Sequence, residues 1–110
     1  MKDYKVYKES FSESFRKEVY EVVSQIPVGK VSTYGGIALL LGAPQCSRMV
    51  GRALKEVPDE LSIPCHRVVN SIGRLVPGWV EQKQLLLAEE VSFKANGCVN
   101  LKEHLWHVDE

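Results

Sequence analysis

The sequence predicts a mainly α single domain with short β hairpins and a winged helix-turn-helix-like architecture. Two short helical patterns separated by a tight glycine-containing turn predict the helix-turn-helix. A length of 110 residues suits one compact domain, residues 1–110, and 45% hydrophobic with 25% charged residues is typical of a globular protein. Apolar or alternating segments beside turn signals predict the hairpins.

The first predicted helix starts at a capping box formed by Ser10 and Glu13 and is expected to end at Pro27. Apolar side chains recur every three or four positions after the cap, as they do on one face of a helix. These positions are Phe11, Phe15, Val19, Val22 and Ile26. The segment is therefore predicted to pack on the core through one apolar face.

Cap and breaker residues bound the two helices of the helix-turn-helix. The first of them is predicted to start at a cap on Ser32 or Thr33 and to end at Gly42. The second is predicted to hold Pro44 in its first turn and to be closed by Pro58. The side chains expected on the buried faces are Ile37, Leu40 and Leu41, followed by Cys46, Met49, Val50, Ala53 and Leu54.

The C-terminal half combines two predicted hairpins with one helix. Residues 63–76 predict a short hairpin around a turn at residues 70–73, and residues 81–90 predict the last helix. An Asn-Gly pair at residues 96–97 is a strong turn signal, which predicts a terminal hairpin within residues 91–101. Both hairpins are expected to pack beside the helices.

The charges are balanced overall but unevenly distributed. The formal net charge is zero, yet residues 29–83 hold seven basic and four acidic side chains. Arg48, Arg52 and Lys55 repeat along one face of the third predicted helix, opposite its apolar side. This face is interpreted either as the DNA-contacting surface of a recognition helix or as an ordinary solvated surface.

Three cysteines occur without a Cys-x-x-Cys pair, so neither a disulfide framework nor a zinc site is expected. No apolar stretch approaches the roughly 20 residues that cross a bilayer, and the N-terminus lacks the apolar core of a signal peptide. We therefore expect reduced thiols in an intracellular, cytoplasmic protein that has no membrane partner.

Cys65 is the cysteine whose neighbours favour reactivity. It follows Pro64 and precedes His66 and Arg67, and positive charge near a thiol can lower its pKa. Adjacent side chains point in different directions, so a Cys65–His66 pair requires a turn or a bridging water. The alternative is a thiol crowded by apolar neighbours, which would have a raised pKa and remain inert.

The run Pro64-Cys65-His66-Arg67-Val68-Val69 resembles the active-site signature of O6-alkylguanine-DNA alkyltransferases, which move an alkyl group from DNA onto their own cysteine. Residues 26–38 and 47–58 resemble the helix-turn-helix of that family, and residues 86–90 resemble its closing helix. The resemblance covers about residues 11–91. It implies the catalytic, DNA-binding domain only, without the additional N-terminal domain of full-length members.

The resemblance implies a role for each matching residue. Cys65 would accept the alkyl group, His66 would take its proton through a water, and Glu90 would orient the His66 ring. Arg48 would fill the space left by the extruded nucleotide, because an unstacked gap costs a few kcal/mol. The implied DNA contacts are Tyr34, Ser47, Arg48, Arg52 and Lys55, and the implied pocket residues are Pro64, Val69, Trp79 and Lys83. Neither a cofactor nor a metal is implied.

Some positions depart from the repair enzymes and resemble the alkyltransferase-like proteins, which bind the lesion without transfer. Val57 replaces an asparagine of the family pattern, the Pro77–Trp79 loop differs, and the ending at residues 97–106 is similar to that group. The expected function is alkyl transfer to Cys65 by a monomer bound to double-stranded DNA containing O6-alkylguanine. The alternatives are a lesion-binding protein that recruits excision-repair proteins and a helix-turn-helix regulator.

Overall fold

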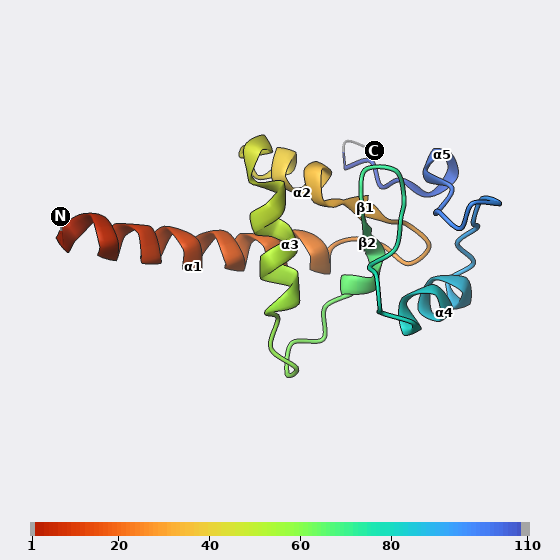
Figure 1. Cartoon of the computed structure of the whole chain (residues 1–110), viewed down its shortest axis with the longest axis horizontal. Coiled ribbons are helices and arrows are strands. Elements are labelled where there is room, and N and C mark those ends of the chain that lie inside the picture. Colours follow the sequence, from red (N-terminus) through yellow and green to blue (C-terminus); the bar gives the residue numbers. More distant parts are fainter. Residues whose placement is uncertain (1, 109–110) are drawn as a thin grey trace.

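The computed structural model describes the backbone of residues 2–108 and the side chains of residues 13–108. The elements in chain order are α1 (Lys2–Ser24), β1 (Ser32–Thr33), α2 (Tyr34–Leu40), the 3-10 helix η1 (Pro44–Cys46), α3 (Ser47–Lys55), the 3-10 helix η2 (Cys65–Arg67), β2 (Val68–Val69), α4 (Glu81–Ala88) and α5 (Leu101–His104). α1 projects from one end of the body, and α4 and α5 lie at the other (Figure 1). The mainly helical fold is confirmed.

α1 is longer than the sequence predicted. It begins at Lys2, so the predicted start at Ser10 is wrong, and it ends at Ser24, just before Pro27. The side chains of Ser10 and Phe11 lie outside the described residues. The buried positions that anchor the helix are Phe15, Val19 and Val23. α1 packs against both α2 and α3, which places the helix-turn-helix on its C-terminal half.

The predicted boundaries of α2 are confirmed. Thr33 caps the helix by accepting a hydrogen bond at its Oγ1 from the Gly36 N–H, at 2.9 Å. Gly42 follows the last turn with a φ of 73°, a left-handed conformation that glycine adopts without strain. Leu40 was expected to be buried but is 47% exposed, because this seven-residue helix turns Ile37 and Ala38 inward instead.

The sheet differs from the predicted hairpins. β1 and β2 pair in parallel, with Ser32 opposite Val68 and Thr33 opposite Val69. The segment after β2 instead forms a loop closed at Asn70, whose Oδ1 accepts hydrogen bonds from the backbone of Ile72 and Arg74. The predicted turn at residues 70–73 is confirmed by a hydrogen bond of 3.0 Å from the Gly73 N–H to the Asn70 carbonyl oxygen. The predicted strand pairing of this hairpin is wrong, because its first arm pairs with the segment that enters α2.

The terminal hairpin is reduced to one antiparallel bridge between Phe93 and Val99. Gly97 has a φ of 88° in the turn, as its Asn-Gly signal predicted. α5 then begins at Leu101, where the hairpin strand was expected to continue. His104 attaches this segment to the body, because its Nδ1 lies 3.0 Å from the Gly29 carbonyl oxygen.

The body contains two buried apolar clusters. One joins α1, α2 and α3, and the other joins β2, α4 and the C-terminal segment. Residues 65–69, which form η2 and β2, run between the two, with Val68 in the first cluster and Val69 in the second. In the part of the chain that the structure describes, no helix is long and apolar enough to cross a membrane.

Candidate functional site

A cavity of about 700 Å³ lies between α3 and the loop before α4. Its walls are mostly apolar, with cationic side chains on the α3 side. The lining residues are Tyr34, Arg48, Gly51, Arg52, Leu54, Lys55, Val57, Cys65, Val76, Pro77 and Trp79. Binding pockets for small ligands commonly measure about 300–1,000 Å³. The cavity is therefore large enough to hold a compact organic group.

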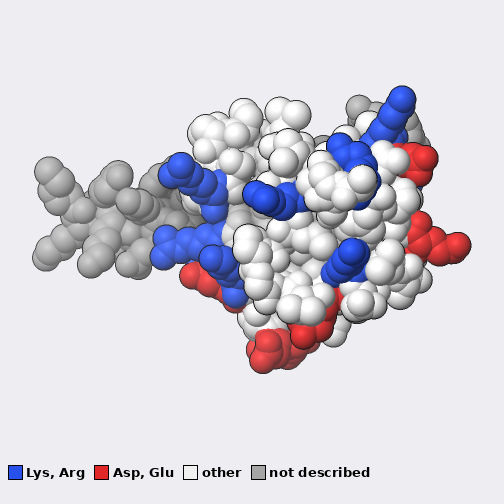
Figure 2. All heavy atoms as spheres, turned by 45° about the vertical axis from the view of Figure 1, so that its right-hand side comes forward, with Lys and Arg blue, Asp and Glu red and all other residues white. Residues whose placement is uncertain are grey.

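The cationic face of α3 borders the cavity. Arg48, Arg52 and Lys55 all line it and are exposed, so their charges remain available to a ligand from solvent. Arg52 also lies 3.6 Å from the Glu56 carboxylate. Basic side chains are spread over the face seen in Figure 2, whereas acidic ones gather mainly along its lower and right-hand edges. This distribution favours a polyanionic partner on the α3 side.

Cys65 lies at the start of η2, half-buried beside the cavity. Burial raises the pKa of the Cys65 thiol above its ordinary value of 9.0, although a hydrogen bond from its own backbone N–H acts in the opposite direction. The expected lowering of this pKa by nearby cations is therefore wrong. The effect of burial dominates, and Arg67, the nearest cation in sequence, is paired with the Glu89 carboxylate, to which its Nη2 donates at 2.8 Å.

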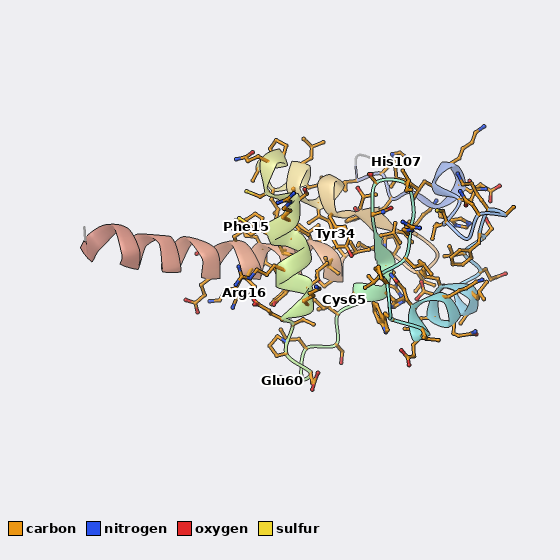
Figure 3. The ribbon with its side chains drawn as sticks, viewed as in Figure 1. Phe15, Arg16, Tyr34, Glu60, Cys65 and His107 are labelled. Carbon is orange, nitrogen blue, oxygen red and sulfur yellow. The ribbon has the colours of Figure 1, made fainter. Side chains whose placement is uncertain are left out.

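Tyr34, the first residue of α2, lines the same cavity as Cys65, and both lie beside α3 in Figure 3. The pKa of Tyr34 is raised by burial and by the negative charge of the Cys65 thiolate. Gly51 faces the Tyr34 ring closely enough that a Cβ there would lie 3.7 Å from it. Two of the predicted site residues, Tyr34 and Cys65, are thus brought together.

The carboxylate beside His66 belongs to Glu89. Its Oε2 lies 2.7 Å from Nε2 of His66, and the Arg67 guanidinium donates to both of its oxygens. Glu90, the residue expected in this position, is exposed and has a φ of 64°. Because α4 ends at Ala88 and the chain then turns through this left-handed residue, the structure places Glu89 and not Glu90 against the imidazole.

Glu89 is held in its ionised form. Burial alone would raise the pKa of its carboxyl group. Hydrogen bonds from Arg67, His66 and the Gly29 N–H outweigh that effect and lower the pKa from 4.5 to about 2. An ionised carboxylate only accepts hydrogen bonds, so Nε2 of His66 carries the proton in this pair. Nδ1 is then the ring nitrogen that can accept a proton from elsewhere.

Gln82 is a further residue at this site, and the sequence did not indicate it. Its side chain is fully buried, and its Nε2 donates to the carbonyl oxygens of His66 and Val68, both at 3.1 Å. Its Oε1 accepts a hydrogen bond of 2.7 Å from the Val76 N–H. A glutamine within a helix of mixed polarity is normally expected to face solvent.

Several of the other predicted site residues lie apart from the cavity. Lys83 places its ammonium 5.5 Å from the centroid of the Phe93 ring, and Val69 is buried in the second cluster. Pro64 precedes η2 but is not part of the cavity lining, and Ser47 lies at the start of α3 away from it. Of the four predicted pocket residues, the structure places Trp79 in the wall.

Nothing within the described residues forms a cluster of three or more His, Cys, Asp or Glu side chains able to hold a metal ion. His66 and Glu89 are instead engaged with each other and with Arg67.

Comparison with known proteins shows consistent similarity to one family. Residues 14–92 match the family described as 6-O-methylguanine DNA methyltransferase, DNA binding domain. The chain is 40% identical over 98 residues to the DNA base-flipping protein of Escherichia coli, covering 86% of this chain and 76% of that protein. It is 40% identical over 78 residues to a methylated-DNA–protein-cysteine methyltransferase of Mycolicibacterium paratuberculosis, covering 69% of this chain and 47% of that protein.

Among solved structures, the chain is similar to Schizosaccharomyces pombe Atl1 in complex with damaged DNA containing O6-carboxymethylguanine. The TM-score is 0.76 at 38% identity, and the match covers 86% of this chain and 96% of that one. The similarity extends over nearly the whole of Atl1 but over less than half of the Mycolicibacterium methyltransferase.

Proposed function

The chain belongs to the family of the 6-O-methylguanine DNA methyltransferase DNA-binding domain, and we propose that it binds O6-alkylguanine in duplex DNA and transfers the alkyl group to Cys65. The observation that carries this proposal is the cavity, which Arg48 on α3 and the Cys65 thiol both line. A base extruded from the duplex would enter from the α3 side and meet the sulfur inside.

The recognition step is assigned to α3 and Tyr34. Arg52 and Lys55 are exposed beside the cavity and would contact backbone phosphates. The O6 atom of guanine lies inside the base pair, so the nucleotide must leave the stack, at a cost of a few kcal/mol. Arg48 would offset part of that cost by occupying the vacated space, and Tyr34 would press on the neighbouring phosphate.

In the transfer step, the Cys65 sulfur bonds to the alkyl carbon while the bond from that carbon to guanine O6 breaks. The electron pair of the broken bond remains on the base. The thiol proton passes to Nδ1 of His66 through a water and is then delivered to the leaving base, so the products are guanine and an S-alkyl cysteine. Glu89 supports this relay because its carboxylate stabilises the charged imidazole. One protein molecule is consumed for each lesion.

A second candidate function is lesion binding without transfer. The raised pKa of the Cys65 thiol favours it, because less of the nucleophilic thiolate is present at neutral pH. Val57 in the cavity wall, where the family pattern has an asparagine, favours it as well. In this case the protein would mark the lesion for excision-repair proteins.

A mass measurement separates the two functions. The protein is incubated with duplex DNA containing O6-methylguanine, and the tryptic peptide that holds Cys65 is weighed, with Cys65→Ser as the control. Transfer predicts the gain of one methyl group on the wild-type peptide alone. An unmodified peptide, together with tighter binding to the methylated than to the plain duplex, would establish the second function. An unmodified peptide together with equal affinity for the two duplexes would reject both.

A further inference from the structure

The Gln82 side chain makes hydrogen bonds to both sides of the cavity. One side is formed by η2 with Cys65, and the other by the loop that contains Val76, Pro77 and Trp79. The Gln82 side chain donates to the carbonyl oxygens of His66 and Val68 and accepts from the Val76 N–H. Both amide N–H groups and the amide oxygen are thus used, each on a backbone atom of a wall-forming segment.

These three hydrogen bonds require a side-chain amide at residue 82. A side chain at residue 82 must donate two hydrogen bonds and accept one, which only asparagine and glutamine amides do. Asparagine is one methylene shorter and would not reach both segments from the same backbone position. The side chain is fully buried, so water does not replace a lost partner and each unpaired backbone group would destabilise the folded chain.

The other hydrogen bonds of the Cys65 segment and of the Val76–Trp79 loop lie mostly within each segment or reach other parts of the chain. The Val76–Trp79 loop closes a turn within itself, through a hydrogen bond of 3.3 Å from the Trp79 N–H to the Val76 carbonyl oxygen. β2 is held by β1 on its other side. Gln82 therefore sets the separation between the Cys65 segment and the wall opposite α3.

We propose that Gln82 is a positioning residue that fixes the width of the base-binding cavity by tying the Cys65 segment to the Val76–Trp79 wall. This inference rests on the proposed function. Its consequence is that discrimination between alkylated and plain duplex depends on a side chain that touches neither the base nor the DNA. In enzyme active sites, a displacement of about 1 Å can lower the reaction rate by about a hundredfold, so the width of such a cavity matters for the reaction as well.

The test measures a ratio, the dissociation constant for plain duplex divided by that for duplex containing O6-methylguanine. Every protein in it carries Cys65→Ser, because transfer would otherwise consume the lesion during the titration, and the wild-type ratio is that of Cys65→Ser alone. A fall in the folded fraction of a variant weakens both constants equally, so loss of stability alone leaves the ratio unchanged. The variants are Gln82→Met, which removes all three hydrogen bonds at similar volume, and Gln82→Glu, which retains the acceptor for Val76 but neither donor at neutral pH. Gln84→Met, at an exposed position of the same helix, is the matched control.

We expect Gln82→Met to lower the ratio toward one and Gln82→Glu to lower it as well, while Gln84→Met keeps the wild-type ratio. If Gln82→Met yields too little folded protein, the ratio for Gln82→Glu decides. A wild-type ratio in the folded Gln82 variant would overturn the inference and leave the proposed function intact. A ratio of one for Cys65→Ser alone would overturn this inference, and an unmodified Cys65 peptide in the wild-type protein would overturn the proposed transfer as well.

Discussion

The Glu89 carboxylate lies 2.7 Å from Nε2 of His66 while it also accepts hydrogen bonds from Arg67. The carboxylate thereby has two cationic or potentially cationic partners on η2, the segment that begins with Cys65. Because Arg67 is permanently charged, its charge balances that of the Glu89 carboxylate, and the Glu89–Arg67 pair is neutral overall even when the His66 ring is neutral. His66 is then oriented by a fixed anion and free to accept a proton at Nδ1.

Replacing Glu89 is expected to lower the free energy of unfolding strongly, whereas replacing Glu90 is not. Glu89→Gln leaves the largely buried Arg67 guanidinium without its counterion, and breaking such a pair destabilises a protein by about 3–5 kcal/mol. Glu90→Gln, at the exposed adjacent position, is the control and should change the free energy of unfolding by less than about 0.5 kcal/mol. Urea denaturation measures both, and equal losses would contradict the assignment of Glu89.

The stability of the protein is expected to fall in acid because of Glu89. Its pKa is lowered from 4.5 to about 2 by folding, so it binds a proton more weakly in the folded than in the unfolded state. The resulting stabilisation, about 3 kcal/mol, is fully present above pH 4.5 and is lost as the pH falls toward 2. Urea midpoints of wild type and Glu89→Gln between pH 2 and 7 should therefore converge in acid. A constant difference would contradict the lowered pKa.

The reactivity of Cys65 toward a small alkylating reagent should rise steeply with pH. Burial raises the pKa of this thiol above 9.0, so the thiolate is a minor species at neutral pH. Labelling with iodoacetamide, followed on the Cys65 peptide by mass spectrometry, is expected to keep accelerating beyond pH 9. An unstructured cysteine peptide of ordinary pKa serves as the reference. A rate that levels off below pH 8 would show an activated thiol instead.

Glu90→Gly is expected to stabilise the protein. Glu90 has a φ of 64°, and the left-handed conformation costs a residue with a side chain about 1–2 kcal/mol that glycine does not incur. Glycine loses more chain entropy on folding, so the net gain should be at most about 1 kcal/mol. Glu90→Ala keeps the strain and is the control. Thermal unfolding at fixed pH should give a higher midpoint for the glycine variant alone, and a lower one would contradict the strain.

The elements that the sequence predicted correctly are those defined by neighbouring residues. Thr33 caps α2 through an N–H three residues away, and Gly42 ends that helix through its own φ, so both signals are local. The pairing of Ser32 with Val68 is not local, and the segment at residues 63–69 equally suits a hairpin arm or a parallel strand. The hairpin prediction failed for this reason.

The same distinction separates the site residues that were found from those that were missed. Cys65, Tyr34 and Trp79 carry recognisable side chains in recognisable runs, and all three line the cavity. Choosing between Glu89 and Glu90 required knowing where α4 ends, and a shift of one residue reverses the answer. Gln82 could not be identified from its neighbours, because its three partners come from other segments of the chain.

The last prediction concerns Arg48 and Lys55, which lie on the same face of α3 but have different proposed roles in DNA binding. Lys55→Ala removes a phosphate contact, so it should weaken plain and methylated duplex equally and lower the slope of log affinity against log salt by about 0.9. Arg48→Ala removes the side chain that fills the vacated stack, so it should weaken the methylated duplex selectively, by about tenfold or more.

Fluorescence anisotropy at several salt concentrations measures both variants on both duplexes, each in a Cys65→Ser background so that transfer does not consume the methylated duplex. Arg48 and Lys55 carry the same charge, line the same cavity and are both exposed, so each serves as the other's control. A purely electrostatic role for α3 predicts the same loss for the two variants on every duplex. That outcome would remove the base-flipping role of Arg48, because a phosphate contact carries no information about the state of the base.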